Sequence, residues 1–295
     1  MPELPDITVY LEHLQSRIVG QPLEKLVIAK PFVLRSFDPP VSEVEGTVVR
    51  GVRRMGKRIV LAMDGERFIV IHLMIAGRLR WRSVGAKLPP KGSILATFHF
   101  PNGVLVLTEA GTTRRASMHL VRGEAGLAEF DRGGLEVLDA TLAEFEARLR
   151  SENHTLKRAL ADPRLFSGIG NAYSDEILHR ARLSPVTLTS RLSDDDIARL
   201  FEATRATLSA WTERLRTEAG RNFPEKVTAF HEGMAVHGRF GEPCPVCGSK
   251  VQRIRYASNE TNYCARCQTG GRLLADRALS RLLGKDWPKS IDDIE

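Results

Sequence analysis

Residues 154–185 read HTLKRALADPRLFSGIGNAYSDEILHRARLSP, and this stretch decides the architecture of the second half of the chain. Apolar residues recur at helical spacing on both sides of the GIG tripeptide, which predicts two helices joined by a tight turn. Glycines let the backbone of such a turn approach a ligand closely, and the free N–H groups at the start of the next helix suit an anion. Asn171 adds a side-chain donor, and Lys157 and Arg158 add positive charge, so the turn fits a DNA phosphate. Taken alone, the pattern is equally consistent with an ordinary tight turn between helices.

The sequence around this turn has the same helical character. TLAEFEARLR (141–150) and SDDDIARLFEATRATLSAWTERLRTEAG (193–220) carry apolar residues three and four positions apart. The dipeptides Asp162-Pro163 and Ser184-Pro185 separate the helices from one another. Residues 218–241 have no clear period, and we expect them to form a loop long enough to be functional.

The first half of the chain has a different pattern. Apolar residues at helical spacing predict one helix, which Asp6 can cap and which ends at Gly20. From Leu23 to about Leu107 follow short runs rich in Val, Ile and Phe, separated by turn signals such as Asn102-Gly103. These runs predict an antiparallel β-sandwich or barrel. The segment EAGTTRRASMH (109–119) has no clean period and is expected to be an exposed loop.

Two CxxC pairs contain all four cysteines of the chain: Cys244 with Cys247, and Cys264 with Cys267, with sixteen residues between the pairs. This spacing is typical of a structural zinc site with four thiolate ligands, in which a β-hairpin brings the second pair to the metal. Such a zinc ion has no open coordination position, so its role is to fold the hairpin. Four unrelated buried cysteines or a redox pair are the alternatives.

The expected hairpin, KVQRIRYASNETNY (250–263), carries Lys250, Arg253 and Arg255 with two tyrosines among them. Basic residues interleaved with aromatic ones fit contact with phosphates. A solvated charged face explains the same residues equally well.

Composition sets the outer limits. The chain has 295 residues, with 43 Lys+Arg against 36 Asp+Glu, which gives a formal net charge of +7. This length predicts two domains, and the surplus of positive charge favours a polyanionic partner. No apolar run is long enough to cross a membrane, and MPELPDITVY (1–10) does not have the pattern of a signal peptide. We therefore expect an intracellular protein, in the cytoplasm, with no membrane partner.

Three segments together resemble one family. GIGNAYSDEIL resembles the helix–two-turn–helix motif of the formamidopyrimidine-DNA glycosylase / endonuclease VIII family of base-excision repair enzymes. MPELPD is similar to the N-terminal signature of that family, and VHGRFGEPCPVCG with NYCARCQ is similar to its zinc finger. The motifs have the order and spacing of the family over residues 2 to about 268. The resemblance implies a bifunctional DNA glycosylase and abasic-site lyase that acts on damaged double-stranded DNA and carries one structural Zn²⁺.

The resemblance also implies catalytic roles for Pro2 and Glu3. In a generic protein, Pro2 is a helix-entry proline and Glu3 a favourable charge at a helix start. Removal of Met1 changes the chemistry, because Pro2 then offers a secondary amine that is partly neutral near pH 7 and can attack C1′ of a deoxyribose. The resulting iminium permits β-elimination of the 3′ phosphate, and Glu3 can move protons to and from the sugar.

Other site residues follow from the same resemblance. Lys57 matches a lysine that contacts phosphate at the lesion, whereas we interpret His72 as a structural residue. The space left by an extruded base must be filled. Met74 or Ile75 is expected to fill it, with Arg114 or Arg115 pairing with the orphaned base.

The sequence departs from the family pattern at two places. Ala116 occupies the position of the aromatic residue that the family inserts into the base stack, and its methyl group is too small for this role. Asn259 replaces an arginine that binds the phosphates flanking the lesion and takes part in δ-elimination. We expect weaker clamping of the lesion and a product mix shifted toward β-elimination, with Arg253 or Arg255 as a substitute cation.

We thus expect a monomeric α+β protein: an N-terminal helix plus an antiparallel β-sandwich domain, then a C-terminal helical domain with a helix–two-turn–helix motif and a zinc-finger β-hairpin. The expected boundaries are 1–132 for the catalytic domain, 133–240 for the helical domain with its lesion-side loop, 241–271 for the zinc finger and 272–295 for a C-terminal extension. The resemblance implies that the excised bases are damaged, oxidised ones. Two alternatives to the enzyme are a noncatalytic DNA-lesion or junction binder on the same scaffold and, less favoured, a zinc-ribbon protein acting on RNA.

Overall fold

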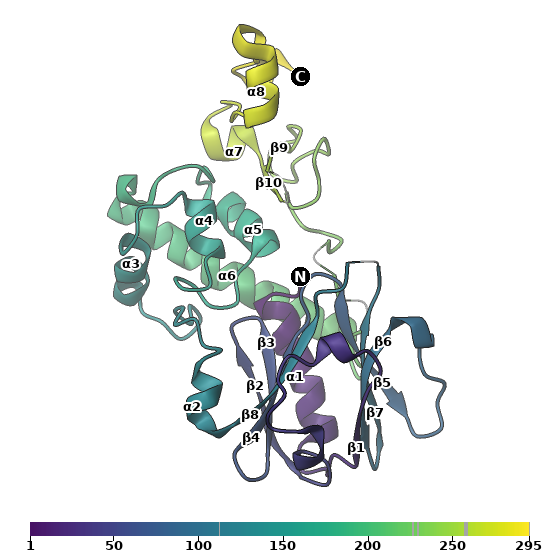
Figure 1. Cartoon of the computed structure of the whole chain (residues 1–295). Helices are drawn as coiled ribbons and strands as arrows, with labels where there is room; N and C mark the ends of the chain where they lie inside the picture. The colour runs from purple at the N-terminus through teal and green to yellow at the C-terminus, as the bar shows by residue number, and fades with distance from the viewer. Residues whose placement is uncertain (112, 226, 229, 257–258, 295) are drawn as a thin grey trace. The chain divides into compact units, whose positions relative to one another are not determined.

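The computed structural model describes residues 1–111, 113–225, 227–228, 230–256 and 259–294. The chain folds into two compact units (Figure 1). Unit 1 comprises Met1–Arg132 and Trp211–Ala229, and unit 2 comprises Gly133–Ala210 and Phe230–Glu295. No helix formed by the described residues is both long and apolar enough to span a bilayer.

Unit 1 is a sandwich of two four-stranded antiparallel sheets. One sheet has the order β1-β6-β7-β5 and consists of β1 (Lys25–Ile28), β6 (Ile94–Phe100), β7 (Gly103–Glu109) and β5 (Gly77–Ser83). The other has the order β2-β3-β4-β8 and consists of β2 (Val49–Met55), β3 (Arg58–Met63), β4 (Arg67–His72) and β8 (Ser117–Arg122). A short helix, α2 (Gly123–Ala128), follows β8. The predicted β-sandwich is confirmed.

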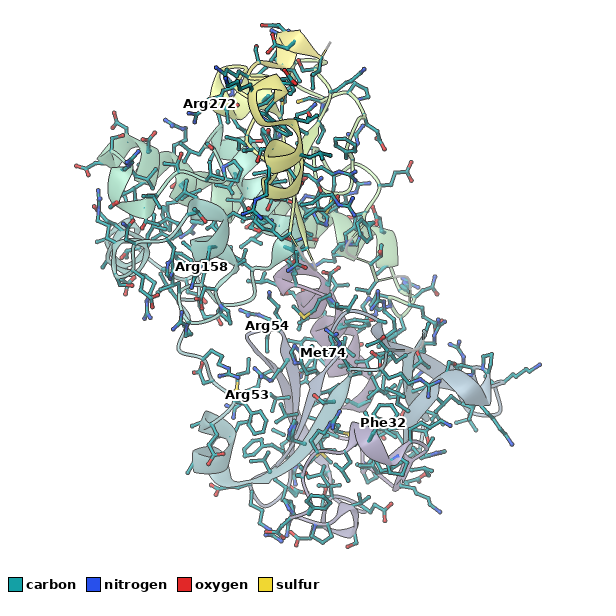
Figure 2. All side chains as sticks on the ribbon, turned by 45° about the horizontal axis from the view of Figure 1, so that its top comes forward. Phe32, Arg53, Arg54, Met74, Arg158 and Arg272 are labelled. Atoms are coloured by element: carbon teal, nitrogen blue, oxygen red, sulfur yellow. The ribbon has the colours of Figure 1, made fainter. Side chains whose placement is uncertain are left out.

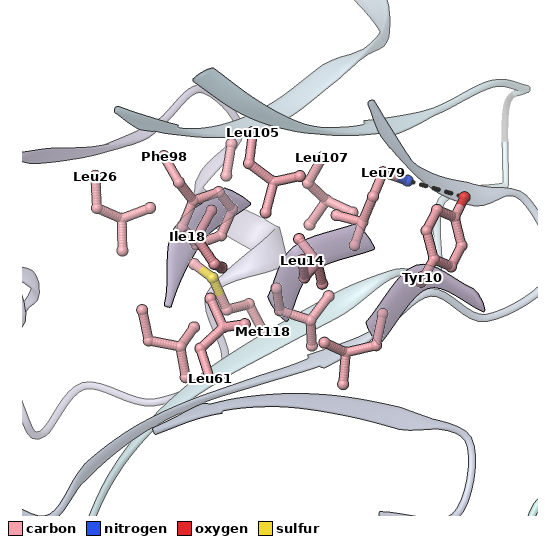
Figure 3. Close-up of a cluster of buried hydrophobic side chains, with 14 of the residues drawn as sticks. Tyr10, Leu14, Ile18, Leu26, Leu61, Leu79, Phe98, Leu105, Leu107 and Met118 are labelled. Carbon is pink, nitrogen blue, oxygen red and sulfur yellow. Dashed lines mark hydrogen bonds between the residues drawn. The ribbon is translucent and has the colours of Figure 1, made fainter. Parts of the chain in front are cut away.

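Helix α1 (Leu4–Ile18) contributes to the core between the two sheets. Its residues Tyr10, Leu14 and Ile18 are fully buried and pack with Leu61 of one sheet and Phe98 of the other (Figure 3). Buried apolar surface of this kind is the main favourable term in folding. The helix is therefore held by the core along its whole length, and this fixes the position of the chain start.

The start of α1 differs from the prediction. The helix begins at Leu4, with Glu3 as its N-cap residue, and Asp6 lies in its first turn. The backbone N–H of Glu3 donates a hydrogen bond to the Asp6 carboxylate over 2.8 Å. Asp6 thus stabilises the helix start from within the first turn instead of capping it from outside. Since Glu3 and Asp6 are each only 2% exposed, this contact is buried.

The segment 109–119 also differs from the expected exposed loop. Strand β7 extends to Glu109, and β8 begins at Ser117 and pairs with β4. Only residues 110–116 connect the two strands, and residue 112 lies outside the described residues. Met118 is fully buried in the core, which explains why the second half of the segment forms a strand.

The first part of the expected loop 218–241 covers unit 1. Helix α6 (Asp194–Ala219) belongs to unit 2 up to Ala210 and to unit 1 from Trp211. Beyond the helix, Phe223 packs against Tyr10 with a ring-centroid distance of 5.6 Å. The Glu225 carboxylate pairs with two arginines of β5. These contacts explain why residues after α6 belong to unit 1.

Unit 2 contains the helices that the sequence predicts. They are α3 (Leu142–Arg150), α4 (Leu156–Ala161), α5 (Asn171–Ala181) and the first part of α6. The hairpin of β9 (Gln252–Arg255) and β10 (Glu260–Tyr263) follows, and then α7 (Ala265–Thr269) and α8 (Arg277–Leu283). The predicted helical part and hairpin are thereby confirmed.

Candidate active site and zinc centre

The N-terminal amino group lies partly buried among charged side chains of unit 1. Pro2 and Glu3 are buried, and Met1 is half-buried. Burial lowers the pKa of the Met1 amino group below its ordinary value. The positive charges of Arg78 and Lys57 lower this pKa further, whereas the carboxylates of Glu3 and Asp6 raise it. The surroundings as a whole thus favour the neutral form of the amine, which is the nucleophilic form.

Lys57 lies in the tight turn between β2 and β3. Gly56 has a φ of +59°, a left-handed conformation that glycine adopts without strain, and Met55 pairs with Arg58 across the turn. Arg58 in turn aligns with His72 at the end of β4. Lys57 and His72 therefore lie at the same end of this sheet.

His72 is surrounded by positive charge. Burial lowers its pKa to about 4, and the charges of Arg58 and Lys57 contribute to the lowering. The imidazole is therefore neutral near pH 7, and it is a poor proton donor there. This agrees with a structural interpretation of His72, which stays a prediction.

Met74 lies on the connection that passes from β4 in one sheet to β5 in the other (Figure 2). Met74 itself has a φ of +53°, and the backbone N–H of Gly77 donates to the Leu73 carbonyl oxygen over 2.9 Å. A Cβ atom at Gly77 would lie 2.2 Å from that oxygen, so only glycine fits this turn. Ile75 is 61% exposed and Met74 half-buried, so Ile75 is the more accessible of the two side chains.

The buried carboxylate of Glu109 fixes the loop that carries Arg114 and Arg115, which we expect to face the orphaned base. Glu109, 1% exposed, accepts hydrogen bonds from the backbone N–H groups of Arg115 and Ala116 over 3.0 and 3.2 Å. Glu109 also pairs with Gly77 across β7 and β5. The loop that carries Met74 leads into β5, and the loop that carries Arg115 follows β7, so both lie at the same end of these paired strands. Sequence reasoning missed Glu109, although an acid at the end of an apolar strand was a usable signal.

Arg114 and Ala116 of this loop differ in how accessible their side chains are. Arg114 is half-buried, and its guanidinium donates to the Gly92 carbonyl oxygen over 2.9 Å. Ala116 is fully buried in the core of unit 1. Its side chain is therefore unavailable to DNA, whatever its size.

In unit 2, the GIG turn ends at Gly170, which precedes α5. The Asn171 side-chain amide donates to the Glu260 carbonyl oxygen over 3.1 Å, which ties the start of α5 to the hairpin. Lys157 donates to the Asn171 carbonyl oxygen and to the Asp175 carboxylate, each over 2.6 Å. Asp175 is buried, so this ammonium group balances a buried charge and positions the turn.

The acidic pair in the first half of α5 forms a network that sequence reasoning missed. The Glu176 carboxylate accepts the backbone N–H groups of residues 235–237 over 2.7–3.0 Å. Asp175 also accepts a hydrogen bond from Nδ1 of His237 over 2.8 Å. The loop before the first cysteine is thus fixed to α5. The signal in the sequence was the pair of adjacent acids, which begins four residues after Asn171.

The basic residues of the hairpin differ in their partners. The Arg253 guanidinium lies over the Phe240 ring, 4.0 Å from its centroid, and 3.6 Å from the Glu260 carboxylate. Asn259 is exposed near the end of the hairpin, and its carbonyl oxygen accepts the backbone N–H of Tyr256 over 2.8 Å. Two residues between them, 257 and 258, lie outside the described residues.

The four cysteine sulfurs form one cluster, with all Sγ atoms within 4.8 Å of one another. Cys244 and Cys267 are 3.9 Å apart, and Cys247 and Cys264 are 3.4 Å apart. Zinc–thiolate bonds of about 2.3 Å give sulfur–sulfur distances of about 3.8 Å in a tetrahedron, so the cluster fits zinc. His179 of α5 lies 3.2 Å from the Cys244 sulfur through Nε2 and connects the helix to the metal site.

Comparison with known proteins agrees with this geometry. Residues 1–116 match the formamidopyrimidine-DNA glycosylase N-terminal domain, residues 135–219 match its H2TH domain, and residues 241–270 match the zinc finger found in FPG and IleRS. A formamidopyrimidine-DNA glycosylase of Heliobacterium modesticaldum is 31% identical over 91% of this chain and 100% of that protein. The chain belongs to the formamidopyrimidine-DNA glycosylase family.

Two solved structures of the Lactococcus lactis family member have the same fold. One is a mutant in complex with a Fapy-dG containing DNA, with a TM-score of 0.79 and 25% identity, covering 91% of this chain and 100% of that one. The other is a complex with an abasic site containing DNA, with a TM-score of 0.79 and 25% identity, covering 90% of this chain and 99% of that one. The α+β fold is thereby shown, and so is the zinc finger with its single structural metal ion.

As a formamidopyrimidine-DNA glycosylase family member, the chain distributes its predicted site residues over both units. The set in unit 1 comprises Pro2, Glu3, Lys57, Met74, Arg114 and Arg115, and the set in unit 2 comprises Asn171, Arg253, Asn259 and the four cysteines. Within unit 1, the amine, Glu3 and Lys57 interact electrostatically. Within unit 2, Asn171 and the hairpin are joined directly. The individual roles of these residues stay predictions.

We predict that His179 tightens zinc binding. Replacement of His179 by Ala removes the contact with the Cys244 sulfur and is expected to lower zinc affinity about 10–100-fold, with one zinc ion still bound per chain. Competition with a chromophoric chelator measures this affinity. Arg180→Ala, on the exposed side of the same helix, is the matched control. Unchanged zinc affinity in His179→Ala contradicts the prediction.

Proposed function

We propose that the Pro2 amine performs the chemistry of this family in this chain. The chain is a base-excision repair DNA glycosylase with abasic-site lyase activity. The observation that supports the assignment of Pro2 is the partly buried chain start, where burial and the charges of Lys57 and Arg78 lower the pKa of the Met1 amine. A neutral, held amine is what nucleophilic attack on a sugar carbon requires.

The proposed reaction begins once Met1 is removed and the Pro2 nitrogen becomes a secondary amine. Its lone pair attacks C1′ of the damaged nucleotide, and the C1′–N bond to the base breaks. The amine loses its proton, and C1′ is then bonded to both the Pro2 nitrogen and the ring oxygen O4′. The C1′–O4′ bond breaks as O4′ takes a proton, which opens the sugar ring and leaves an iminium between C1′ and nitrogen. This iminium acidifies the C2′ protons. Loss of one such proton expels the 3′ phosphate by β-elimination. Glu3, which is buried beside the amine, delivers and removes protons at the sugar.

The other residues bind and open the DNA. We propose that Lys57 contacts the phosphate at the lesion, because it lies in a sheet-end turn close enough to act on the amine. Asn171 and Arg253 of the hairpin contact the flanking backbone. Met74 or Ile75 fills the vacated space, and Arg114 or Arg115 faces the orphaned base. Because Ala116 is buried, no aromatic wedge assists them from this position.

The substrate is damaged double-stranded DNA. The complex of the Lactococcus lactis relative with a Fapy-dG containing DNA supports oxidised bases as the excised class. We further propose that the chain acts as a monomer inside the cell, where its DNA substrate lies. In this proposal the chemistry takes place in residues 1–132. The DNA backbone is bound by residues 133–240 and by the zinc finger at 241–271. Residues 272–295 form a C-terminal extension.

A noncatalytic lesion binder is the second candidate. The buried Ala116 and the uncharged Asn259 favour it, because each weakens a step that precedes or follows base removal. Both candidates predict DNA binding that falls as salt rises. They differ in whether Pro2 becomes covalently attached to DNA.

We predict that borohydride traps a covalent adduct between this protein and abasic-site DNA, because it reduces the iminium. Gel electrophoresis measures the adduct, and peptide mapping is expected to place it on Pro2. Pro2→Leu is the control, since a large second residue retains Met1 and removes the imino group. Equal trapping in Pro2→Leu, or an adduct mapped to a lysine, refutes the proposed role of Pro2. Absence of any adduct from wild-type protein whose intact mass confirms Met1 removal supports the noncatalytic binder.

We predict that Lys57→Met changes the pH profile of the trapping rate: the rise of the rate on the acidic side of the profile moves to higher pH. The charge of Lys57 lowers the pKa of the Met1 amine. We expect the same charge to act on the Pro2 amine once Met1 is removed, so that its loss raises the pKa of this amine and the neutral form appears only at higher pH. Initial trapping rates from about pH 5 to 9 measure the shift. Lys25→Met, an exposed lysine of β1, serves as control. A rise that stays in place, or moves to lower pH, contradicts the prediction.

We predict that Asn259→Arg restores δ-elimination. A guanidinium at this exposed hairpin position adds a positive charge for the flanking phosphates, which asparagine lacks. The ratio of δ to β product on abasic-site DNA is expected to rise several-fold, as read on a denaturing gel. Asn259→Gln, which adds length without charge, should leave the ratio as in the wild type. Mostly δ product from the unmodified chain overturns this prediction.

A further inference from the structure

Unit 2 contains a pocket that the proposed reaction does not use. Its volume is about 540 Å³, which lies in the range of small-molecule sites. Apolar side chains from three segments line part of it, namely Val186 and Leu188 after α5, Ile254 of β9, and Ala275. An apolar lining of this kind suits a flat, weakly polar group.

Two arginines line the same pocket. Arg158 of α4 and Arg255 of β9 are both exposed (Figure 2 labels Arg158). Within the residues that the structure describes, neither guanidinium makes an ion pair or a hydrogen bond, whereas their neighbours Lys157 and Arg253 are both paired with carboxylates. Unpaired guanidinium groups on two different elements of one pocket fit an anion that both can contact, and a phosphate is the group they bind best.

The third feature is an aromatic ring. Tyr256 lines the pocket directly after β9 and is 53% exposed. An exposed tyrosine beside positive charge is the arrangement by which proteins stack unpaired bases without sequence preference. His154 also lines the pocket, and its Nε2 is occupied by the Glu152 carboxylate at 2.6 Å. Asn153 and Thr155 line the pocket as well, so its lining combines two cations, one aromatic ring, two uncharged polar residues and an apolar part.

The C-terminal extension builds one side of this pocket. The zinc-finger match ends at residue 270, and the chain beyond it packs Leu273, Leu274 and Ile291 against Ile254 and the hairpin. The backbone N–H of Leu274 donates to the Tyr263 hydroxyl over 2.8 Å.

One buried acid fixes the position of Arg255. The Asp276 carboxylate is 3% exposed and accepts the backbone N–H of Arg255 over 2.9 Å. Ala275, its neighbour in the chain, lines the pocket itself. The extension thus supplies part of the lining and holds the β9 end from which Arg255 and Tyr256 project.

We propose that this pocket binds one nucleotide unit, with its phosphate between Arg158 and Arg255 and its base stacked on Tyr256. The chemistry is that of a phosphorylated nucleoside, which either an unpaired stretch of DNA or a free nucleotide offers. As a DNA-strand site it rests on the proposed function, because only then does DNA reach unit 2. A strand held here contacts unit 2 at a third place, in addition to the GIG turn and Arg253.

Photo-crosslinking of the full-length, zinc-loaded protein tests this proposal. Two probes are used: 5-iodo-2′-deoxyuridine 5′-monophosphate and a single-stranded thymidine pentanucleotide that carries one iodouracil. Irradiation is expected to attach the probe to the peptide that contains Tyr256, because iodouracil reacts with an aromatic ring stacked on it. Arg158→Ala and Arg255→Ala should each lower the yield about tenfold, through loss of a charge-assisted hydrogen bond. Arg180→Ala, an exposed arginine of α5 outside the pocket, should leave the yield as in the wild type.

The outcomes distinguish a DNA strand from a free nucleotide as the ligand, and the Tyr256→Phe variant controls for misfolding. Crosslinking by the pentanucleotide alone assigns the site to a DNA strand, and crosslinking by both probes assigns it to any nucleotide. Tyr256→Phe should keep the crosslink because the ring is retained, and Tyr256→Leu should lose it. A crosslink outside the pocket, no crosslink with either probe, or equal yields in Arg158→Ala and Arg180→Ala overturns the proposal. Performing the same experiment on Pro2→Leu keeps this result independent of lyase chemistry, so each proposal can fail alone.

Discussion

The hydrogen bond between the Glu3 backbone and the Asp6 carboxylate is the contact on which the proposed chemistry depends. The first residues of a chain are normally poorly ordered, and a nucleophile at that place needs to be held. Here the first residue of α1 follows directly on Glu3, and the helix is part of the core of a β-sandwich. The terminal amine therefore takes its position from a helix that packs in the core of unit 1. Burial also removes water that stabilises the charged form of the amine, and this lowers the pKa of the amine.

In unit 2, the corresponding element is α5. One face of this short helix contacts in turn the hairpin through Asn171, the preceding helix through Asp175, the loop before the zinc site through Glu176, and a zinc ligand through His179. Eleven residues thus contact the preceding helix and three places in the last quarter of the chain. Because the zinc site anchors the hairpin at one end and α5 anchors it at the other, the basic side chains of the hairpin extend from a fixed strand. A structural metal therefore contributes to DNA recognition without touching DNA.

Much of this was predictable from local sequence. The CxxC pairs, the GIGN turn and the proline at position 2 are short motifs whose chemistry follows from residue type and spacing, and the strands of the sandwich follow from their alternation. The predictions that were wrong depend on partners far along the chain. Asp6 reads as an outside cap until the burial of Glu3 is known, and the strand that starts at Ser117 is set by pairing with β4. Likewise, the anchoring of Arg115 by Glu109 and the covering of unit 1 by residues after α6 arise from tertiary contacts that no local pattern encodes.

The burial of Ala116 limits how this enzyme can be redesigned. Its side chain lies in the core, and its N–H is held by Glu109, so the backbone at this point faces inward. A phenylalanine introduced here would enlarge a filled interior, at a cost of about 1–3 kcal/mol, and would still not reach a base stack. Grafting an intercalating ring onto this scaffold therefore calls for a longer connection between β7 and β8 and not for an exchange of one amino acid.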